Sequence, residues 1–362
     1  MADGNAQAQR LPFLEATRRR NAVLGNIDFG EGKETKMEIK KVGFVNRLIV
    51  HIDADVTPTE SGAGTLALHE DGIFNLLKQV EVNINISSAN PVKLSGFALK
   101  QCNMLNRYGF APDRAGVGRV VPFSTLVNTP IVSGNVNKWR CSFTVPIALN
   151  SHRDANIGCL PMFARGLRAD LVIRWNKFSD CISGASSVTA ANVNVQVESD
   201  YFEMPNPEVV NLSSWFVVKR YSELQGVNVK GDNKIEVPQE GALLAMHHIL
   251  RLQGSRSDAI KEGRLYLNFN DEPYRQSLRT NRLVNREGLG LDMETGVMLW
   301  NFLNNDNLGF SGSLRETFDT GRIATFDSFL TIADDAVLGN NPSVNTIETI
   351  RTIVQPLVVP QR

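Results

Sequence analysis

The chain has 362 residues, and its 38 basic and 38 acidic side chains leave a formal net charge of zero. The length favours two domains, and the balanced charge argues against a protein that works mainly by binding nucleic acid, because such proteins are usually basic. No stretch approaches the ~18 apolar residues of a membrane span, and the first residues lack the layout of a secretion signal. We therefore expect a chain that is soluble when it is made.

The first 34 residues are predicted to be an arm outside the folded core. Residues 6–24 are compatible with a helix broken by Pro12, and residues 25–32 with a flexible segment. The densest basic cluster of the chain lies here, at Arg10, Arg18, Arg19 and Arg20. Guanidinium groups match phosphate oxygens, so the cluster is a candidate contact with nucleic acid or lipid headgroups. An arm that lies on a neighbouring subunit is an equally good interpretation.

Alternation of apolar and polar residues dominates the rest of the chain. It is clearest over residues 44–56, 80–86, 139–147, 193–201 and 265–269. One apolar and one polar face is the pattern of a half-buried antiparallel strand. Because turns rich in Gly, Pro, Asn and Ser separate the segments, the pattern predicts a β-sandwich or barrel.

Three helices are predicted among the strands. Residues 94–108 form the clearest candidate, with Ser95 as N-cap and Gly109 just past the end. The other two candidates span residues 272–286 and residues 292–303, the last with Asp292 as its cap.

The second predicted helix carries four arginines at spacings of four, three and four: Arg275, Arg279, Arg282 and Arg286. On one helix they would share a narrow face, where like charges repel. Acidic residues of a neighbouring subunit or bound anions would offset this repulsion, which makes the helix a candidate subunit contact. A solvated helix face is the simpler interpretation.

Two prolines within three residues, at Pro205 and Pro207, predict an extended linker over residues 205–209. Strand-rich blocks lie on both sides, over residues 35–204 and 210–362, and each contains an inserted helix. We therefore predict one architecture used twice, by pattern rather than by residue identity.

Side chains suited to catalysis or metal binding do not cluster in the sequence. The four cysteines include no CxxC pair and are expected to be reduced and buried, at Cys102, Cys141, Cys159 and Cys181. The histidines form neither HxH nor HExxH, the spacings typical of zinc and iron sites: His51, His69, His152, His247 and His248. Asp53 and Asp55 share a strand face and could hold calcium, although a solvated face is the simpler interpretation. We expect no catalytic, cofactor or metal site.

Residues 144–175 carry the most specific pattern. A strand ends at Pro146, a polar loop covers residues 150–156, a corner follows at Leu160 and Pro161, and residues 167–175 alternate as a further strand. This order resembles a signature of the double jelly-roll major capsid proteins of tailless icosahedral viruses, among them membrane-containing bacteriophages. Pro146, Leu160 and Pro161 form the strand-corner motif that carries the resemblance.

The resemblance implies an all-β fold of two tandem eight-stranded antiparallel jelly rolls with short inserted helices. It implies a homotrimer with a pseudo-hexagonal outline that tiles an icosahedral shell, without enzymatic activity. Long loops, at residues 111–138 and 304–315, would supply contacts between subunits. The implied partners are further copies, minor capsid and vertex proteins, and membrane lipid or packaged genome on the side of the arm. The protein would be made in the host cytoplasm and reside in the virion.

Two other classes of function stay open. A carbohydrate-binding β-sandwich spike or adhesin predicts an exposed groove lined by aromatic residues, and the aromatic content of 7% gives this little support. A β-sandwich glycoside hydrolase predicts two carboxylates at catalytic separation with a perturbed pKa.

Overall fold

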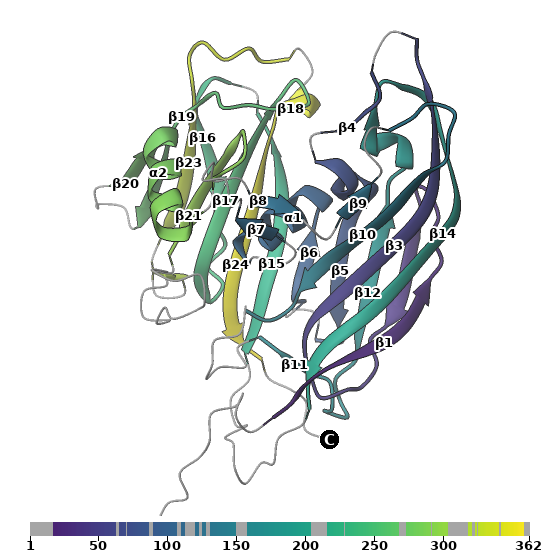
Figure 1. Cartoon of the computed structure of the whole chain (residues 1–362). Helices are drawn as coiled ribbons and strands as arrows, with labels where there is room; N and C mark the ends of the chain where they lie inside the picture. The colour runs from purple at the N-terminus through teal and green to yellow at the C-terminus, as the bar shows by residue number, and fades with distance from the viewer. Residues whose placement is uncertain are drawn as a thin grey trace, which may run out of the picture.

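Two β-sandwiches stand side by side in the protein (Figure 1). The computed structural model describes residues 17–62, 65–69, 71–86, 90–106, 110–112, 120–122, 125–127, 131–149, 158–203, 216–227, 229–267, 273–290, 292–302, 318–320, 323, 325–339 and 342–357. No helix in these ranges is long and apolar enough to cross a membrane.

The first sandwich has eight main strands in two sheets. They are β1 (Arg19–Ile27), β2 (Glu34–Glu38), β3 (Phe44–Glu60), β5 (Leu77–Ile84), β6 (Val92–Leu94), β10 (Asn137–Pro146), β12 (Ala169–Trp175) and β14 (Ala185–Phe202). The sheets have the orders β1-β14-β3-β10 and β2-β12-β5-β6. Numbered one to eight along the chain, these orders are 1-8-3-6 and 2-7-4-5, which is jelly-roll topology.

The second sandwich repeats this topology. Its main strands are β15 (Phe216–Gly226), β16 (Gly231–Glu236), β17 (Ala242–Leu252), β19 (Ile260–Leu267), β20 (Tyr274–Ser277), β21 (Val297–Asn301), β23 (Phe326–Ile332) and β24 (Thr346–Pro356). Their orders, β15-β24-β17-β21 and β16-β23-β19-β20, are again 1-8-3-6 and 2-7-4-5. The prediction of one architecture used twice is confirmed.

Short strands complete the sheets or the loops between them. They are β4 (Ala67–Leu68), β7 (Phe110–Pro112), β8 (Val120–Pro122), β9 (Thr125–Val127), β11 (Leu160–Pro161), β13 (Ile182–Ser183), β18 (Ser255–Arg256) and β22 (Phe318–Asp319). The described residues also contain three 3₁₀ turns: η1 (Gly72–Leu76), η3 (Phe178–Cys181) and η6 (Pro342–Val344).

The two rolls share one continuous sheet. Strand β6 of the first roll pairs in parallel with β15 of the second, with Val92 opposite Arg220 and Lys93 opposite Tyr221. The Arg220 amide donates to the Pro91 carbonyl at 2.8 Å. One sheet of each roll thereby joins a ten-stranded sheet, which holds the rolls edge to edge.

The period-two pattern explains the cores. On β3 the side chains of Leu48, Val50 and Ile52 are at most 1% exposed, whereas Asp53, the next residue, faces solvent. Each fully buried aliphatic side chain contributes about 1.5–3 kcal/mol to folding. The polar face of each strand stays in water. The alternation along each strand therefore determines which side chains enter the core and which face solvent.

Each roll carries a helix between its fifth and sixth main strands, and the boundaries only partly match the prediction. Helix α1 (Gly96–Leu105) has the expected N-cap, since the Ala98 amide donates to Ser95 Oγ at 3.1 Å. Helix α2 (Leu278–Leu289) begins later than predicted, after its own cap Ser277. It ends at Gly290, whose φ of 62° is left-handed.

The predicted third helix, over residues 292–303, is wrong. Residues Val297–Asn301 form β21, which pairs with β17 so that Met298 lies opposite His248. Four successive residues of this strand are buried, so the segment has no polar face. A short apolar run of this kind carries no period that separates a strand from a helix.

The prediction of an arm over residues 1–34 is also wrong for its second half. Residues Arg19–Ile27 are β1, the first strand of the first roll, and β2 begins at Glu34. Strand β1 covers the edge of β14, and a register shift between Val23 and Gly25 lets Leu24 and Ile27 both turn into the core. Arg10, the rest of the arm and the linker at residues 205–209 lie outside the described residues.

Candidate functional site

The strand-corner motif lies along one edge of β3. Strand β10 ends with Pro146 opposite Arg47, and β11 then places Leu160 and Pro161 opposite Val45 and Phe44. The chain therefore leaves β3 at one proline and returns beside it at the next. Proline suits both positions, because it has no amide hydrogen to offer to a ladder.

The excursion between the two prolines is held by a buried arginine of the second roll. Arg220, on β15, is 1% exposed. Its guanidinium donates to three successive carbonyls, those of Pro146 at 3.1 Å, Ile147 at 3.0 Å and Ala148 at 2.8 Å. The motif that the sequence singled out is therefore where the first roll is fastened to the second.

Gly158 brings the returning chain close to the same strand. Its φ is +83°, and a Cβ there would lie 2.4 Å from Val218 Cγ2 and 3.3 Å from Ala148 Cα. Only glycine fits such a left-handed position at this distance from β15. Gly158 thus has a steric function at the contact between the rolls.

A second contact is a cluster of buried and partly buried charges around α1. Lys100 Nζ lies 3.3 Å from Asp71 and 2.6 Å from Glu294, and Arg256 reaches the same two carboxylates at 3.3 and 2.9 Å. Burial raises the pKa of Asp71, whereas Lys100 and Arg256 oppose that shift. Asp71 and Lys100 belong to the first roll and Arg256 and Glu294 to the second, so the cluster ties the two together.

Phe97, on α1, extends this contact. The guanidinium carbons of Arg251 and Arg256 lie 5.0 and 4.8 Å from the centre of its ring, within the range of cation–π attraction. Arg251 also pairs with Glu348 at 2.9 Å, and the Ser95 hydroxyl donates to the same carboxylate at 2.5 Å. Through this helix the first roll packs against β17, β18 and β24 of the second.

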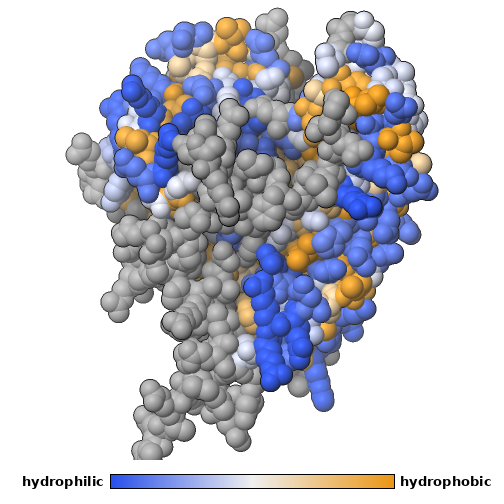
Figure 2. All heavy atoms as spheres, in the orientation of Figure 1, coloured by the Kyte–Doolittle hydropathy of each residue, from blue (hydrophilic) through white to orange (hydrophobic). Residues whose placement is uncertain are grey.

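Helix α2 occupies the equivalent place in the second roll but faces outward (Figure 1). Its inner face is mixed: Leu278 and Leu289 are buried, and between them the amides of Asn281 and Asn285 donate to the Leu299 carbonyl at 2.8 and 2.9 Å. On its outer face Leu283 and Val284 are 55% and 48% exposed. Figure 2 shows patches of apolar surface among hydrophilic side chains in the region of α2. We refer to Arg279, Leu283, Val284 and Arg286 as the α2 face.

The four arginines predicted to share a helix face are distributed differently. Arg275 lies on β20 and pairs with Glu262 at 2.5 Å. Arg282 donates two hydrogen bonds to the Asp258 carboxylate, of 2.9 and 2.5 Å, and Arg286 lies 3.5 Å from Asp292. Three of the four charges are therefore offset by carboxylates of the same chain, which removes the need for a neighbouring subunit to neutralise them.

The arginines at the start of β1 are also paired within the roll. Arg19 and Arg47 both bind Asp200, the second at 2.8 Å, and Arg20 lies 2.8 Å from Glu203. Burial would raise the pKa of Asp200, yet the hydrogen bonds from the two arginines hold it below its usual range. Arg18 is exposed.

The cysteines are free and buried, as predicted. Burial raises the pKa of Cys102 and of Cys141 to about 12, so both thiols stay protonated and unreactive at neutral pH. Among the described residues no group of three or more histidine, cysteine or carboxylate side chains could hold a metal ion.

His247 and His248 are neighbours on β17 and both are buried, as structural histidines. Successive strand residues point to opposite faces. His248 Nε2 lies 2.8 Å from Ser328 Oγ, and its Nδ1 lies 3.2 Å from Thr349 Oγ1. Burial lowers the pKa of His247 to about 4 and that of His248 to about 3.

This pair predicts a loss of stability in acid. In the folded protein both rings stay neutral down to about pH 4, whereas the unfolded chain takes up protons below its ordinary pKa of about 6.5. Moving from pH 7 to pH 5 should therefore lower the free energy of unfolding by about 2 kcal/mol per histidine. Urea titrations at both pH values measure this, and the double variant His247→Gln/His248→Gln should show a smaller difference between them. An equal difference in both proteins would contradict the assignment.

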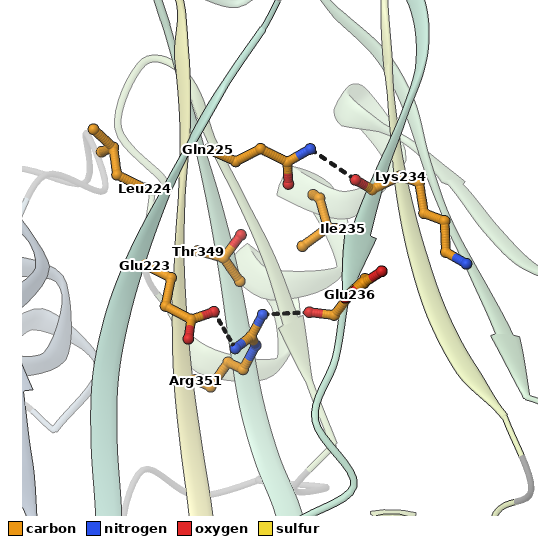
Figure 3. A pocket seen from close by; sticks show the side chains of 8 residues that line it. All are labelled: Glu223, Leu224, Gln225, Lys234, Ile235, Glu236, Thr349 and Arg351. Atoms are coloured by element: carbon orange, nitrogen blue, oxygen red, sulfur yellow. Dashed lines mark hydrogen bonds and ion pairs between the residues drawn. The ribbon is translucent and has the colours of Figure 1, made fainter.

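A cavity of about 550 Å³ opens between β15 and β16, at the edge of the second roll (Figure 3). Arg351 crosses it and donates to Glu223 at 2.6 Å and to the Glu236 carbonyl at 2.5 Å, while Gln225 donates to the Lys234 carbonyl at 2.9 Å. Strand β16 is outermost in its sheet. The side chains that line the cavity thus donate hydrogen bonds to carbonyls of an edge strand, so their role is to stabilise that strand.

Comparison with known proteins finds similarity in structure. No protein-family model and no curated protein matches the sequence. VP54 of PBCV-1, fitted into a reconstruction of the virophage Sputnik, is 14% identical over 93% of this chain and 94% of its own, with a TM-score of 0.65. The MCP of STIV is 12% identical over 93% and 97%, with a TM-score of 0.63. The Faustovirus major capsid protein is 9% identical over 99% and 93%, with a TM-score of 0.63.

The chain has the double jelly-roll fold. The likeness extends over nearly the whole length of all three neighbours, so it covers both rolls and their side-by-side placement. The fold that the strand-corner motif implied is thereby confirmed. The residues that fasten the rolls, Arg220 and Gly158, were not singled out by the sequence.

Proposed function

We propose that the protein is a major capsid protein that forms a homotrimeric, pseudo-hexagonal capsomer. The observation that carries the proposal is the repeat: one chain holds two rolls of the same topology, side by side and joined in one sheet. Three such chains supply six similar rolls, and a near-hexagonal block tiles a closed shell. The Faustovirus neighbour is a major capsid protein.

The contact inside the chain supports a matching contact between chains. Helix α1 lies between the rolls and packs on β17, β18 and β24 (Figure 1). Helix α2 is its counterpart, and β3 and β14 of the first roll are the counterparts of β17 and β24. In a closed ring of six rolls, the α2 face of one copy therefore lies against β3 and β14 of the next.

Charge and apolar surface fit that arrangement. The α2 face offers Leu283 and Val284 beside Arg279 and Arg286, the second of which is also 3.5 Å from Asp292. The outer side of β3 offers Asp53, which lies 4.0 Å from Arg140, and Asp55, which accepts a hydrogen bond from Asn192. Subunit interfaces of obligate oligomers bury apolar residues in their centre, with polar residues around them. In the assembled shell the trimer would meet further trimers and the minor and vertex proteins of the virion.

Two measurements test this function. Light scattering of the purified protein should give three times the chain mass of 40.0 kDa, and negative-stain micrographs of concentrated protein should show hexagonal arrays. A stable monomer that makes no arrays at any concentration would overturn the proposal.

A further inference from the structure

Strands β1 and β20 each form one end of a sheet, and they lie on opposite sides of the molecule (Figure 1). Strand β1 begins the six-stranded sheet of the first roll, and β20 ends the four-stranded sheet of the second. Among the described residues no further strand pairs with their outer edges. An edge of this kind presents backbone N–H and C=O groups to which another strand can pair.

The joint inside the chain shows how such an edge is used. The four strands β2-β12-β5-β6 end at β6, where β15 continues them into six strands of the second roll. At this joint the Arg220 amide donates to the Pro91 carbonyl at 2.8 Å. The sheet that ends at β20 also has four strands, and the sheet that begins at β1 has six. Joining these two sheets between copies would therefore make a second sheet of ten strands.

The segment before α2 repeats the segment before α1. Both have a proline, a basic residue and a serine at the same spacing: Pro91, Lys93 and Ser95 before α1, and Pro273, Arg275 and Ser277 before α2. In both places the serine caps the helix that follows. The two strands also pair on their inner side with the fourth main strand of their roll, β6 with β5 and β20 with β19. Strand β20 is therefore the counterpart of β6.

A bulge shared by the two rolls makes it possible to align β1 with β15. On β3 the pairing with β14 passes over Asn46, and on β17 the pairing with β24 passes over Leu244. In each roll the chain just after the sixth main strand donates to the carbonyl of the residue that is passed over. Ala148 does so to Asn46 at 2.8 Å, and Phe302 does so to Leu244 at 3.0 Å.

Counted from these bulges, Asn21 of β1 is the counterpart of Arg220. Asp200 and Thr352 pair with the residues that directly follow the two bulges. On the other side Asp200 lies opposite Asn21, and Thr352 lies opposite Arg220. The position that bonds to β6 inside the chain is thus occupied by Asn21 on β1.

The backbone of Asn21 faces the outer edge of β1. The Glu203 amide, just after β14, donates to the Arg18 carbonyl, just before β1, at 2.9 Å. Residues that exchange backbone hydrogen bonds alternate along an antiparallel pair. Every second residue counted from Arg18 therefore faces β14, and Asn21 faces away from it. Arg220 has the same orientation on β15, where its amide bonds to the first roll.

Apolar side chains lie exposed on both edges. Val23 on β1 and Tyr274 on β20 are 52% and 56% exposed. Val92, the counterpart of Tyr274 on β6, is fully buried at the joint inside the chain. The Val23 carbonyl accepts a hydrogen bond from Lys40 Nζ at 3.5 Å, so the open stretch of β1 lies before Val23.

We propose that β20 of one copy pairs in parallel with β1 of the next, so that a ten-stranded sheet crosses each boundary between subunits. In this register Asn21 lies opposite Tyr274 of the neighbouring copy, as Arg220 lies opposite Val92 within the chain. The Asn21 amide donates to the Pro273 carbonyl, and the Arg275 amide donates to the Asn21 carbonyl. The inference rests on the proposed function, because it takes the trimer as given and names the strands that join its copies head to tail.

Disulfide cross-linking of the full chain tests the pairing. The variant Asn21→Cys/Tyr274→Cys places two thiols on opposite residues of strands that lie about 5 Å apart, within the range of a disulfide. The native cysteines are buried, so they do not compete. Oxidation should give linked products of two and three chains on a denaturing gel, and a reductant should return the single chain of 40.0 kDa.

The matched control is Asn26→Cys/Tyr274→Cys. It moves one thiol to another exposed asparagine of β1, five residues and about 16 Å further along the strand. This pair should give no more linked product than the single variant Tyr274→Cys. Equal linking of the control and the Asn21 pair would overturn the register and the pairing that depends on it.

Two parallel measurements separate this inference from the proposed function. Light scattering gives the mass: a trimer whose Asn21 and Tyr274 thiols do not link overturns the pairing and leaves the trimer standing, whereas a monomer that does not link overturns both. Hydrogen exchange of the unmodified trimer is independent of the cysteines. Slow exchange of the Asn21 and Arg275 amides supports the pairing, and fast exchange of both contradicts it.

Discussion

Replacement of Arg220 by alanine is expected to lower the free energy of unfolding by about 3–5 kcal/mol. The side chain is 1% exposed and donates to three carbonyls of the first roll from a strand of the second. Without it those carbonyls stay buried and lose donors that water cannot replace, and the removed side chain leaves a void at the contact. Urea unfolding followed by circular dichroism measures the loss.

Two further variants separate this effect from charge alone. Arg220→Lys keeps the positive charge but not the planar fork, so its stability should lie between those of the parent and the alanine variant. Arg275→Ala removes an arginine whose side chain is 64% exposed, and it should cost less than about 0.5 kcal/mol. If Arg220→Ala were as mild as Arg275→Ala, the motif would not be the fastening point between the rolls.

Most strands could be predicted because their signal is local. On β3 the buried Leu48, Val50 and Ile52 alternate with residues on the solvent side, and a few consecutive residues are enough to show this pattern. Strand β1 was not predicted, because its first residues are arginines and a run of arginines is typical of a solvent-exposed arm. What makes them part of the roll is Asp200, 181 residues away from Arg19, and no local pattern contains that partner.

The helical region around α2 shows a different limit. The middle of the inner face of α2 is formed by Asn281 and Asn285, whose side chains satisfy the backbone of β21 at Leu299, and Leu278 and Leu289 are buried at its ends. Its apolar Leu283 and Val284 face outward. The rule that the apolar side of a helix is the buried one therefore holds only in part for α2 in a single chain, and in the proposed trimer another copy would cover the two exposed side chains.

The strand-corner motif was visible, but its purpose was not. Pro146 and Pro161 mark where a strand stops, which depends only on the missing amide hydrogen. The partner of the motif is Arg220, which binds backbone carbonyls that every residue type possesses. Because Arg220 binds backbone atoms, it requires no particular side chains at residues 146–148. The sequence alone therefore could not show that these residues contact β15.

The double variant Leu283→Asp/Val284→Asp is expected to convert the trimer into a folded monomer. Both side chains are about half exposed in the single chain, so aspartate there should change the unfolding midpoint little. In the trimer each would carry a charge into an interface next to Asp53 and Asp55 of the next copy. The cost is about 2 kcal/mol or more per side chain, which repeats at every contact of the ring. Light scattering measures the mass.

The matched control for that variant is Leu224→Asp/Val337→Asp, because these side chains are 66% and 68% exposed and lie outside the α2 face. The control should remain at three times 40.0 kDa. If the α2 variant also kept that mass, a different surface would close the ring, and the contact inside the chain would not be the template for the contact between chains.

A variant on the opposite side of the proposed contact, Asp53→Arg/Asp55→Arg, should also give monomers, since it places like charges against Arg279 and Arg286. Agreement of the two variants from opposite sides would locate the interface, because loss of assembly from one side alone is also explained by damage to that side.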